Sequence, residues 1–195
     1  NKYMYISSHN FFDKDQIRVK YSKTETVGNV DELTHPIIKE VLKQFHICGA
    51  LEISSNADVP SGTGLGSSSS FTVGLLHNMY VRAGRYVTKE QLADEACDIE
   101  IKQLKEPIGK QDQYAAAFGG INIIKFNPNG TVEVEPVHIK MDTFKTLQQN
   151  LLMFYIGSQR KASDILQEQK NNMTEQDKIA ILKEMVKLVW RLRDS

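Results

Sequence analysis

Hydrophobic and polar positions along this chain alternate in some stretches and recur at helical spacing in others. Residues 16–27 alternate, which predicts a strand followed by a turn at Gly28-Asn29. Apolar residues then recur every three or four positions behind Pro36, and this spacing predicts a helix that starts there. Residues 50–57 alternate again and predict a second strand. The mixture of the two periods predicts an α+β fold.

The middle of the chain continues this mixture. Helical spacing predicts one helix over residues 68–83 and another over 89–104. Thr88 is expected to cap the second helix, with Gln91 completing a capping box. Two alternating segments within residues 121–139 are joined by Asn-Pro-Asn-Gly, which is typical of a β-hairpin.

The last 45 residues form the predicted second domain. A short apolar run at 151–156 predicts a buried strand, and helices are predicted over 161–171 and 175–193. The end of the hairpin before this strand favours a division into domains 1–150 and 151–195. The chain opens without an initiator methionine and stops after an amphipathic stretch, so segments are expected to be missing at both ends.

Composition excludes several classes of partner. Lys plus Arg equals Asp plus Glu at 24 each, so the net charge predicts neither a nucleic-acid nor a membrane-surface partner. No apolar run reaches the length of a membrane span, and no secretory signal opens the chain, which favours a cytoplasmic protein. The two cysteines, Cys48 and Cys97, are interpreted as reduced and buried thiols. The five histidines lack metal-ligand spacing.

The most informative segment runs from Asp58 to Tyr80, where three glycines (Gly62, Gly64 and Gly66) and four serines separate a predicted strand from a predicted helix. Glycines let a backbone approach a ligand closely, and the first turn of a helix offers N–H groups and positive dipole. This arrangement predicts a site for a phosphate. No lysine follows as in a Walker A loop, and the glycines do not have dinucleotide-fingerprint spacing.

The ten residues from Pro60, Pro-Ser-Gly-Thr-Gly-Leu-Gly-Ser-Ser-Ser, resemble the PxxxGLGSSA loop of the GHMP kinases. That superfamily includes galactokinase, homoserine kinase, mevalonate kinase and phosphomevalonate kinase. Residues 108–120 resemble the segment with the family's acidic residue, and residues 155–160 resemble the start of its C-terminal domain. The family's first and third motifs are missing from the chain, which is interpreted as truncation.

The resemblance implies a two-domain fold. The N-terminal domain would be similar to ribosomal protein S5 domain 2 and bind ATP, and the C-terminal domain would be ferredoxin-like. ATP and the acceptor would meet in the cleft between the domains, and the chain would be incomplete at both ends. A homodimer is left open.

The resemblance also implies roles for individual residues. ATP would be bound by loop residues: Pro60, Gly62, Gly64, Leu65, Gly66, Ser67, Ser68 and Ser69. Magnesium would be held by Ser68 and Glu100, with Glu106 as the competing carboxylate. Asp112 would orient the acceptor hydroxyl or accept its proton as the catalytic residue. The substrate would also contact Gly109 and Gln111; Gln113 is a further flanking candidate, and Arg160 is a weak one.

Within the superfamily, the stretches 58–76, 105–113 and 157–163 look most like the heptose kinases of bacteria. Such a kinase would transfer the γ-phosphate of ATP to the C1 hydroxyl of D-glycero-D-manno-heptose 7-phosphate, on the route to GDP-heptose and surface polysaccharide. Three alternatives stay open. They are a GHMP kinase for galactose, fucose or a related sugar, a non-catalytic relative that senses a sugar or nucleotide, and a nucleic-acid module, which the charge balance disfavours.

Overall fold

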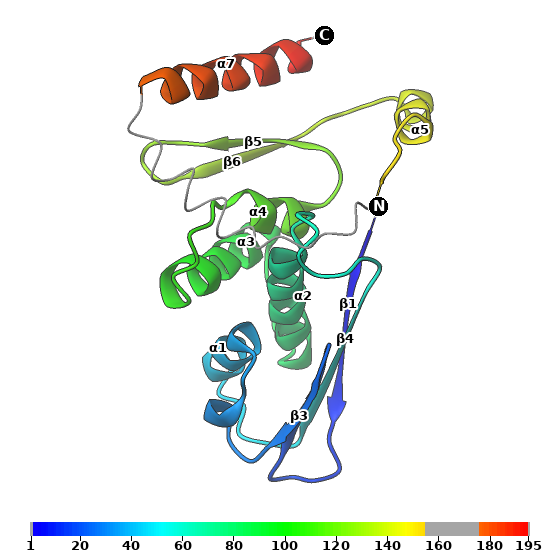
Figure 1. Cartoon of the computed structure of the whole chain (residues 1–195). Helices are drawn as coiled ribbons and strands as arrows, with labels where there is room; N and C mark the ends of the chain where they lie inside the picture. Colours follow the sequence, from blue (N-terminus) through cyan, green and yellow to red (C-terminus); the bar gives the residue numbers. More distant parts are fainter. Residues whose placement is uncertain (1, 155–175, 195) are drawn as a thin grey trace.

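The computed structural model describes residues 2–154 and 176–194. Its N-terminal part is built on a four-stranded sheet with the strand order β1-β4-β2-β3 (Figure 1). The central strand β4 runs antiparallel to β1 and parallel to β2. The strands are β1 (Met4–Asn10), β2 (Ile17–Lys20), β3 (Thr24–Val27) and β4 (Leu51–Ala57).

Helices cover one face of this sheet, and α2 packs directly against β1 (Figure 1). Pro36 occupies the first turn of α1 and the His35 ring accepts a bond from the Ile38 N–H, as a helix start requires. The helical elements here are η1 (Val30–Glu32), α1 (Pro36–Gln44), α2 (Ser67–Arg82), α3 (Lys89–Cys97), the π-helical segment η2 (Asp98–Gln103) and α4 (Gln111–Phe118). The core lies between helices and sheet and is built from side chains such as Val41, Leu51 and Leu75.

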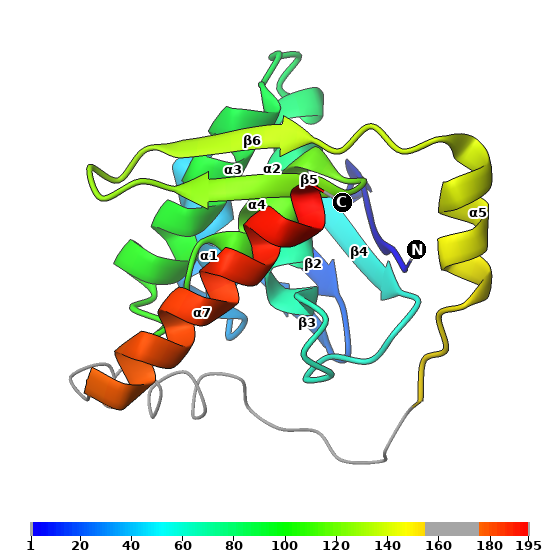
Figure 2. The same cartoon turned by 90° about the horizontal axis from the view of Figure 1, so that it is seen from above.

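The predicted hairpin is confirmed as β5 (Asn122–Phe126) and β6 (Val132–Pro136). It lies over α3 and α4, with apolar side chains that include Ile124 and Val134 packed against Tyr114 and Cys97 (Figures 1 and 2).

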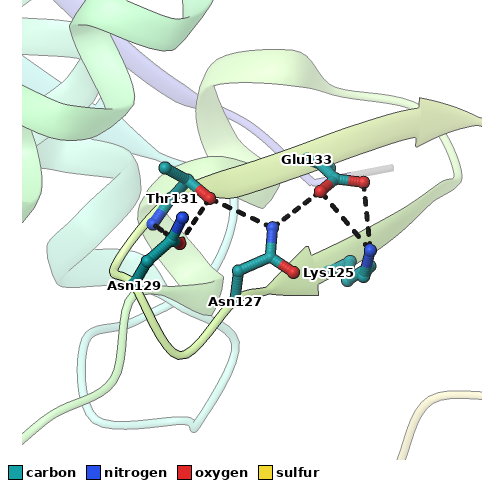
Figure 3. A network of polar contacts seen from close by, with 5 residues as sticks. All are labelled: Lys125, Asn127, Asn129, Thr131 and Glu133. Carbon is teal, nitrogen blue, oxygen red and sulfur yellow. Dashed lines mark hydrogen bonds and ion pairs between the residues drawn. The ribbon is translucent and has the colours of Figure 1, made fainter.

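Polar contacts close the tip of the hairpin (Figure 3). The Asn127 amide donates to Thr131 Oγ1 at 3.1 Å and to Glu133 Oε1 at 2.7 Å. Lys125 reaches the same carboxylate from the opposite strand, and Asn129 accepts two bonds from Thr131. Lys110, just before α4, donates to the Gly130 carbonyl. The hairpin therefore braces the start of α4.

Beyond the hairpin, α5 (Met141–Gln149) stands apart from the rest of the molecule, and α7 (Gln176–Arg193) confirms the predicted last helix (Figures 1 and 2). The predicted buried strand at 151–156 is wrong for residues 151–154, which form no strand and are exposed. Within residues 2–154 and 176–194 no strand pairs with them, and an apolar run alone cannot supply one. The rest of that run and the predicted helix 161–171 lie outside the described residues.

Two other predictions are corrected. The alternation over residues 16–27 spans two strands, because Tyr21 N–H bonds to Lys23 O and turns the chain between β2 and β3. Of the two cysteines, Cys97 is buried as expected, but Cys48 is exposed because it follows α1 in a surface connection.

Candidate functional site

The glycine-rich segment forms the connection from β4 to α2, as predicted (Figure 1). Gly62, Gly64 and Gly66 have φ values of +74°, +73° and +65°, a left-handed conformation that costs other residues energy. Gly66 is the N-cap of α2, and no side chain bonds to the helix start. The first-turn N–H groups of α2 therefore have no side-chain cap, which is the local arrangement that binds phosphates.

Asp112 lies against this loop. A Cβ atom built on Gly66 would lie 3.2 Å from Asp112 Cγ, tighter than most real contacts, so the carboxyl group packs directly on the loop backbone. Asp112 is in the first turn of α4 and is exposed. Gln111 and Gly109 are also exposed at this end of α4. The three residues predicted to face the acceptor are thus close in the chain, and Asp112 packs on the loop at Gly66.

Ser68 and Glu100 meet, although 32 residues separate them. The Ser68 hydroxyl donates to Glu100 Oε1 at 2.6 Å, and the Gln113 amide donates to Glu100 Oε2 at 2.6 Å. Glu100 is 1% exposed and lies in η2, and π-helical turns are frequent at functional sites. The main-chain carbonyl of Glu100 accepts from the Glu106 N–H, but the Glu106 side chain is exposed. Of the two competing carboxylates, Glu100 is the one that contacts Ser68.

The surroundings of Glu100 differ from those of the other buried carboxylate, Glu52. Lys20 donates to Glu52 and holds the pKa of its carboxyl below the usual range, with Arg18 and His9 close by. Within residues 2–154 and 176–194, no Lys, Arg or His forms an ion pair with Glu100, whose side-chain partners are both neutral. A buried carboxylate with neutral partners fits a position that receives a cation.

The chemistry of these groups fits Mg²⁺, which binds hard oxygen ligands and takes one or two carboxylates together with substrate phosphates. The Glu100 carboxylate and the Ser68 hydroxyl would supply the protein ligands. No group of three or more His, Cys, Asp or Glu that could hold a metal by itself occurs among the described residues.

Two pockets flank the loop. The first has a volume of about 720 Å³ and is lined by Ser68 and Glu100, together with Pro60, Gly62, Ser67 and Glu106. Its other wall carries the rings of Tyr21, His35 and Phe71, and burial lowers the pKa of His35. The second has a volume of about 710 Å³ and is lined by Leu65, Gly66 and Asp112, with His77 and Lys89.

The remaining predicted site residues line neither pocket: Gly64, Ser69, Gly109 and Gln111. The Ser69 side chain is buried in the core, so only its backbone could face a ligand. Arg160 lies outside the described residues. Sequence reasoning missed the aromatic wall of the first pocket and the basic residues of the second, which are Lys2, His77 and Lys89. Several of these residues, such as Tyr21 and Lys89, come from elements distant from the loop in the chain, and the pattern of α2 does not mark Phe71 or His77 as pocket residues.

Comparisons with known proteins agree with this geometry. Residues 32–120 match the GHMP kinases N terminal domain. The chain is 31% identical to a D-glycero-alpha-D-manno-heptose 7-phosphate kinase of Campylobacter jejuni over 157 residues, which is 79% of this chain and 46% of that protein. It therefore spans about half the length of this curated relative.

Two solved structures share the fold. A D-glycero-D-manno-heptose 1-phosphate kinase from Bacteroides thetaiotaomicron superposes with a TM-score of 0.63 at 26% identity, over 70% of this chain and 48% of that one. The mevalonate kinase of Methanococcus jannaschii gives a TM-score of 0.67 at 17% identity, over 96% of this chain and 62% of that one. No helix in the described part of the chain is long and apolar enough to cross a membrane. Residues 32–120 of the chain therefore form a GHMP kinase N-terminal domain.

Proposed function

We propose that this chain is part of an ATP-dependent sugar kinase that transfers the γ-phosphate of ATP to the C1 hydroxyl of a sugar phosphate. The observation that carries the proposal is the position of two carboxylates on opposite sides of one glycine loop. Glu100 contacts Ser68 in the first pocket, and Asp112 packs on Gly66 in the second. Phosphoryl transfer needs this separation, with one carboxylate for the nucleotide's cation and one for the acceptor.

The first pocket is the proposed nucleotide site. Its aromatic wall offers faces for a base, and its floor includes the start of α2, whose N–H groups would bind the phosphates. The bound Mg²⁺ would neutralise charge on the phosphates during transfer. Ser68 and Glu100 would hold that ion against the loop. The protein would thus position the ion, and the positive charge of the ion would offset the charge of the phosphates.

The second pocket is the proposed acceptor site. Asp112 would accept a hydrogen bond from the reacting hydroxyl and so orient it, or take its proton. His77 and Lys89 line the same pocket, and Lys89 is held near it by a bond to the Phe118 carbonyl. Basic groups in this pocket favour an acceptor that already carries a phosphate. The heptose phosphate named for the relative at 31% identity is such an acceptor.

In this proposal the product is a sugar phosphorylated at C1, which suits activation to a nucleotide sugar for surface polysaccharide in the cytoplasm. A GHMP kinase for an unphosphorylated sugar such as galactose is the competing assignment. The basic residues of the second pocket favour the phosphorylated acceptor over it.

The test measures ADP release by the full-length protein with Mg²⁺-ATP and a panel of acceptors that includes D-glycero-D-manno-heptose 7-phosphate, galactose and fucose. We expect turnover on the heptose phosphate only. Turnover on an unphosphorylated sugar alone would keep the kinase and overturn the acceptor class. Nucleotide binding without turnover on any acceptor would favour a sensor.

The Asp112→Asn variant removes the charge but keeps the shape of the side chain. We expect kcat to fall by about two to four orders of magnitude, because general acid–base groups contribute on that scale. The KM for ATP should change little, since Asp112 lines the other pocket. Asp142→Asn, an exposed carboxylate in α5, is the matched control and should keep wild-type kinetics. A variant with normal kcat would exclude Asp112 from the reaction.

A further inference from the structure

Gln113 is the one fully buried amide that contacts a candidate site residue in the described part of the chain. It is 0% exposed and lies next to Asp112 in the first turn of α4. Its Nε2 donates to Glu100 Oε2, while Glu100 Oε1 accepts from Ser68. One oxygen of the Glu100 carboxylate is therefore held by a buried donor, and the other lies on the side of Ser68 and the first pocket.

The other end of the same amide indicates why it is there. Gln113 Oε1 is buried and has no hydrogen-bond partner. A buried acceptor without a partner destabilises the folded protein, and an apolar side chain of similar size would avoid this cost. The amide is thus oriented by Glu100, because only its NH₂ end can face a carboxylate. Its Nε2 gives the buried Glu100 carboxylate a donor, while its Oε1 gains no bond in return.

We propose, on the basis of the proposed function, that Gln113 is a positioning residue that holds the Glu100 carboxylate with Oε1 directed at Ser68 and the nucleotide-bound cation. The partners that orient a metal ligand fix its direction, and their loss typically weakens metal affinity or activity by 10- to 100-fold. Because Gln113 adjoins Asp112, the same turn of α4 sets the direction of Glu100 and carries the acceptor carboxylate. One short helix thereby couples the cation side of the loop to the acceptor side.

The test uses Gln113→Leu, which removes the amide donor and keeps approximately the side-chain volume. Mn²⁺ is titrated into the full-length protein with a non-hydrolysable ATP analogue, and binding is followed by electron paramagnetic resonance. We expect the Kd for Mn²⁺ to rise about 10-fold or more. Analogue binding in EDTA should stay unchanged, because the loop backbone is intact. Gln103→Leu, an exposed glutamine in the same π-helical segment as Glu100, is the matched control and should bind Mn²⁺ normally.

Unfolding by urea separates positioning from packing. Gln113→Leu removes the unpartnered amide oxygen but also leaves Glu100 Oε2 without its donor, so the two effects on the free energy of unfolding oppose each other. A positioning role predicts that the variant is folded under the titration conditions and still binds Mn²⁺ weakly. If Gln113→Leu does not fold, Gln113→Met gives the same comparison with a more adaptable side chain. Unchanged Mn²⁺ affinity in a folded variant would overturn the inference while leaving the proposed function intact. Failure of the wild-type protein to bind Mn²⁺ with the analogue would instead overturn the proposed function.

Discussion

Gly66 meets two separate requirements at one position. Its φ of +65° is unfavourable for any residue with a Cβ atom, and the space where that atom would lie is occupied by Asp112. Gly84, after α2, has the same φ of +65° but has no atom within 4 Å of its Cβ position. Substitutions at Gly66 and Gly84 therefore separate the effect of backbone strain from the effect of contact with Asp112.

We therefore expect Gly84→Ala to lower the free energy of unfolding by about 1–2 kcal/mol through strain alone, and to leave kcat unchanged. Gly66→Ala should lose more stability and also lower kcat at least 10-fold, because Asp112 is displaced. Urea unfolding and ADP release on the three proteins provide the measurement. Equal kinetic effects in the two variants would contradict the contact argument.

The stability of the first pocket's wall depends on pH through His35. Its ring caps α1 and packs near Tyr21 and Phe71, and burial lowers its pKa below the usual 6.5. Below about pH 6.5 the unfolded chain therefore binds a proton that folded His35 rejects, so stability falls as pH drops further. Above that pH both states are neutral and His35 contributes no pH dependence.

His35→Asn keeps a capping side chain and removes the titration. Its loss of stability between pH 7.5 and 5.5, measured by urea unfolding, should be smaller than that of the wild type. The control is His138→Asn, because His138 is exposed. If His35→Asn lost as much stability between pH 7.5 and 5.5 as the wild type, other groups would be responsible for the acid sensitivity.

At this scale the sequence singled out as candidates the residues that stand in its motifs. Gly66, Ser68 and Asp112 could be predicted as candidates because each stands in a stretch of sequence that resembles a family motif. The role of Gln113 could not, because its partner Glu100 reaches it only through the packing of η2 against α4. The unpartnered amide oxygen is visible only in the folded protein.

Among the elements, α3 and η2 form one continuous path from a helix cap to the buried carboxylate. Thr88 Oγ1 accepts from the Gln91 N–H at 3.1 Å, which confirms the predicted cap. The Gln91 side chain does not complete the box within the described contacts. It bonds Tyr80 and Glu95 instead. The start of α3 is thus tied to α2.

Thr88→Ala should lower the free energy of unfolding by about 1 kcal/mol, the usual cost of losing a helix cap. Thr88→Ser retains the hydroxyl and should recover most of that loss. Thermal or urea unfolding of the two variants gives the comparison. Equal stability of the alanine and serine variants would show that the hydroxyl does not cap the helix.

The ends of helices and strands were predicted correctly where a residue of a particular type marks them. Pro36 and Thr88 start their helices and Asn-Pro-Asn-Gly turns the hairpin, as expected. It failed at residues 21–23, where a turn without glycine or proline joins two alternating strands. It also failed at 151–154, because an apolar run becomes a strand only when another strand pairs with it.

At the scale of the whole molecule, the two cysteines differ in exposure, so the thiol of one should react in the folded protein and that of the other only after unfolding. Cys48 is exposed at the surface. Cys97 is buried between α3, α4 and the hairpin, and burial raises its pKa to about 12. The thiolate is the reactive form of cysteine. Burial therefore slows the reaction of Cys97 in two ways, because reagents cannot reach the sulfur and the raised pKa keeps the thiol protonated.

With an aromatic disulfide reagent at pH 8, we expect one of the two thiols to react rapidly and the other only after unfolding. Cys48→Ser should remove the fast phase and leave the slow one. Urea should accelerate the slow phase in step with loss of structure. Two fast thiols in the folded protein would contradict the burial of Cys97.

The central place of β4 has a consequence for how the protein acquires its ligand during synthesis. Both neighbours of β4 precede it in the chain, and its pairing joins residues as distant as Met4 and Ala57. Pairing over such separations is slow. The glycine loop follows β4 directly, so a growing chain reaches the loop only after all four described strands have been made. Under the proposed function, nucleotide binding would therefore favour the chains in which these strands have paired.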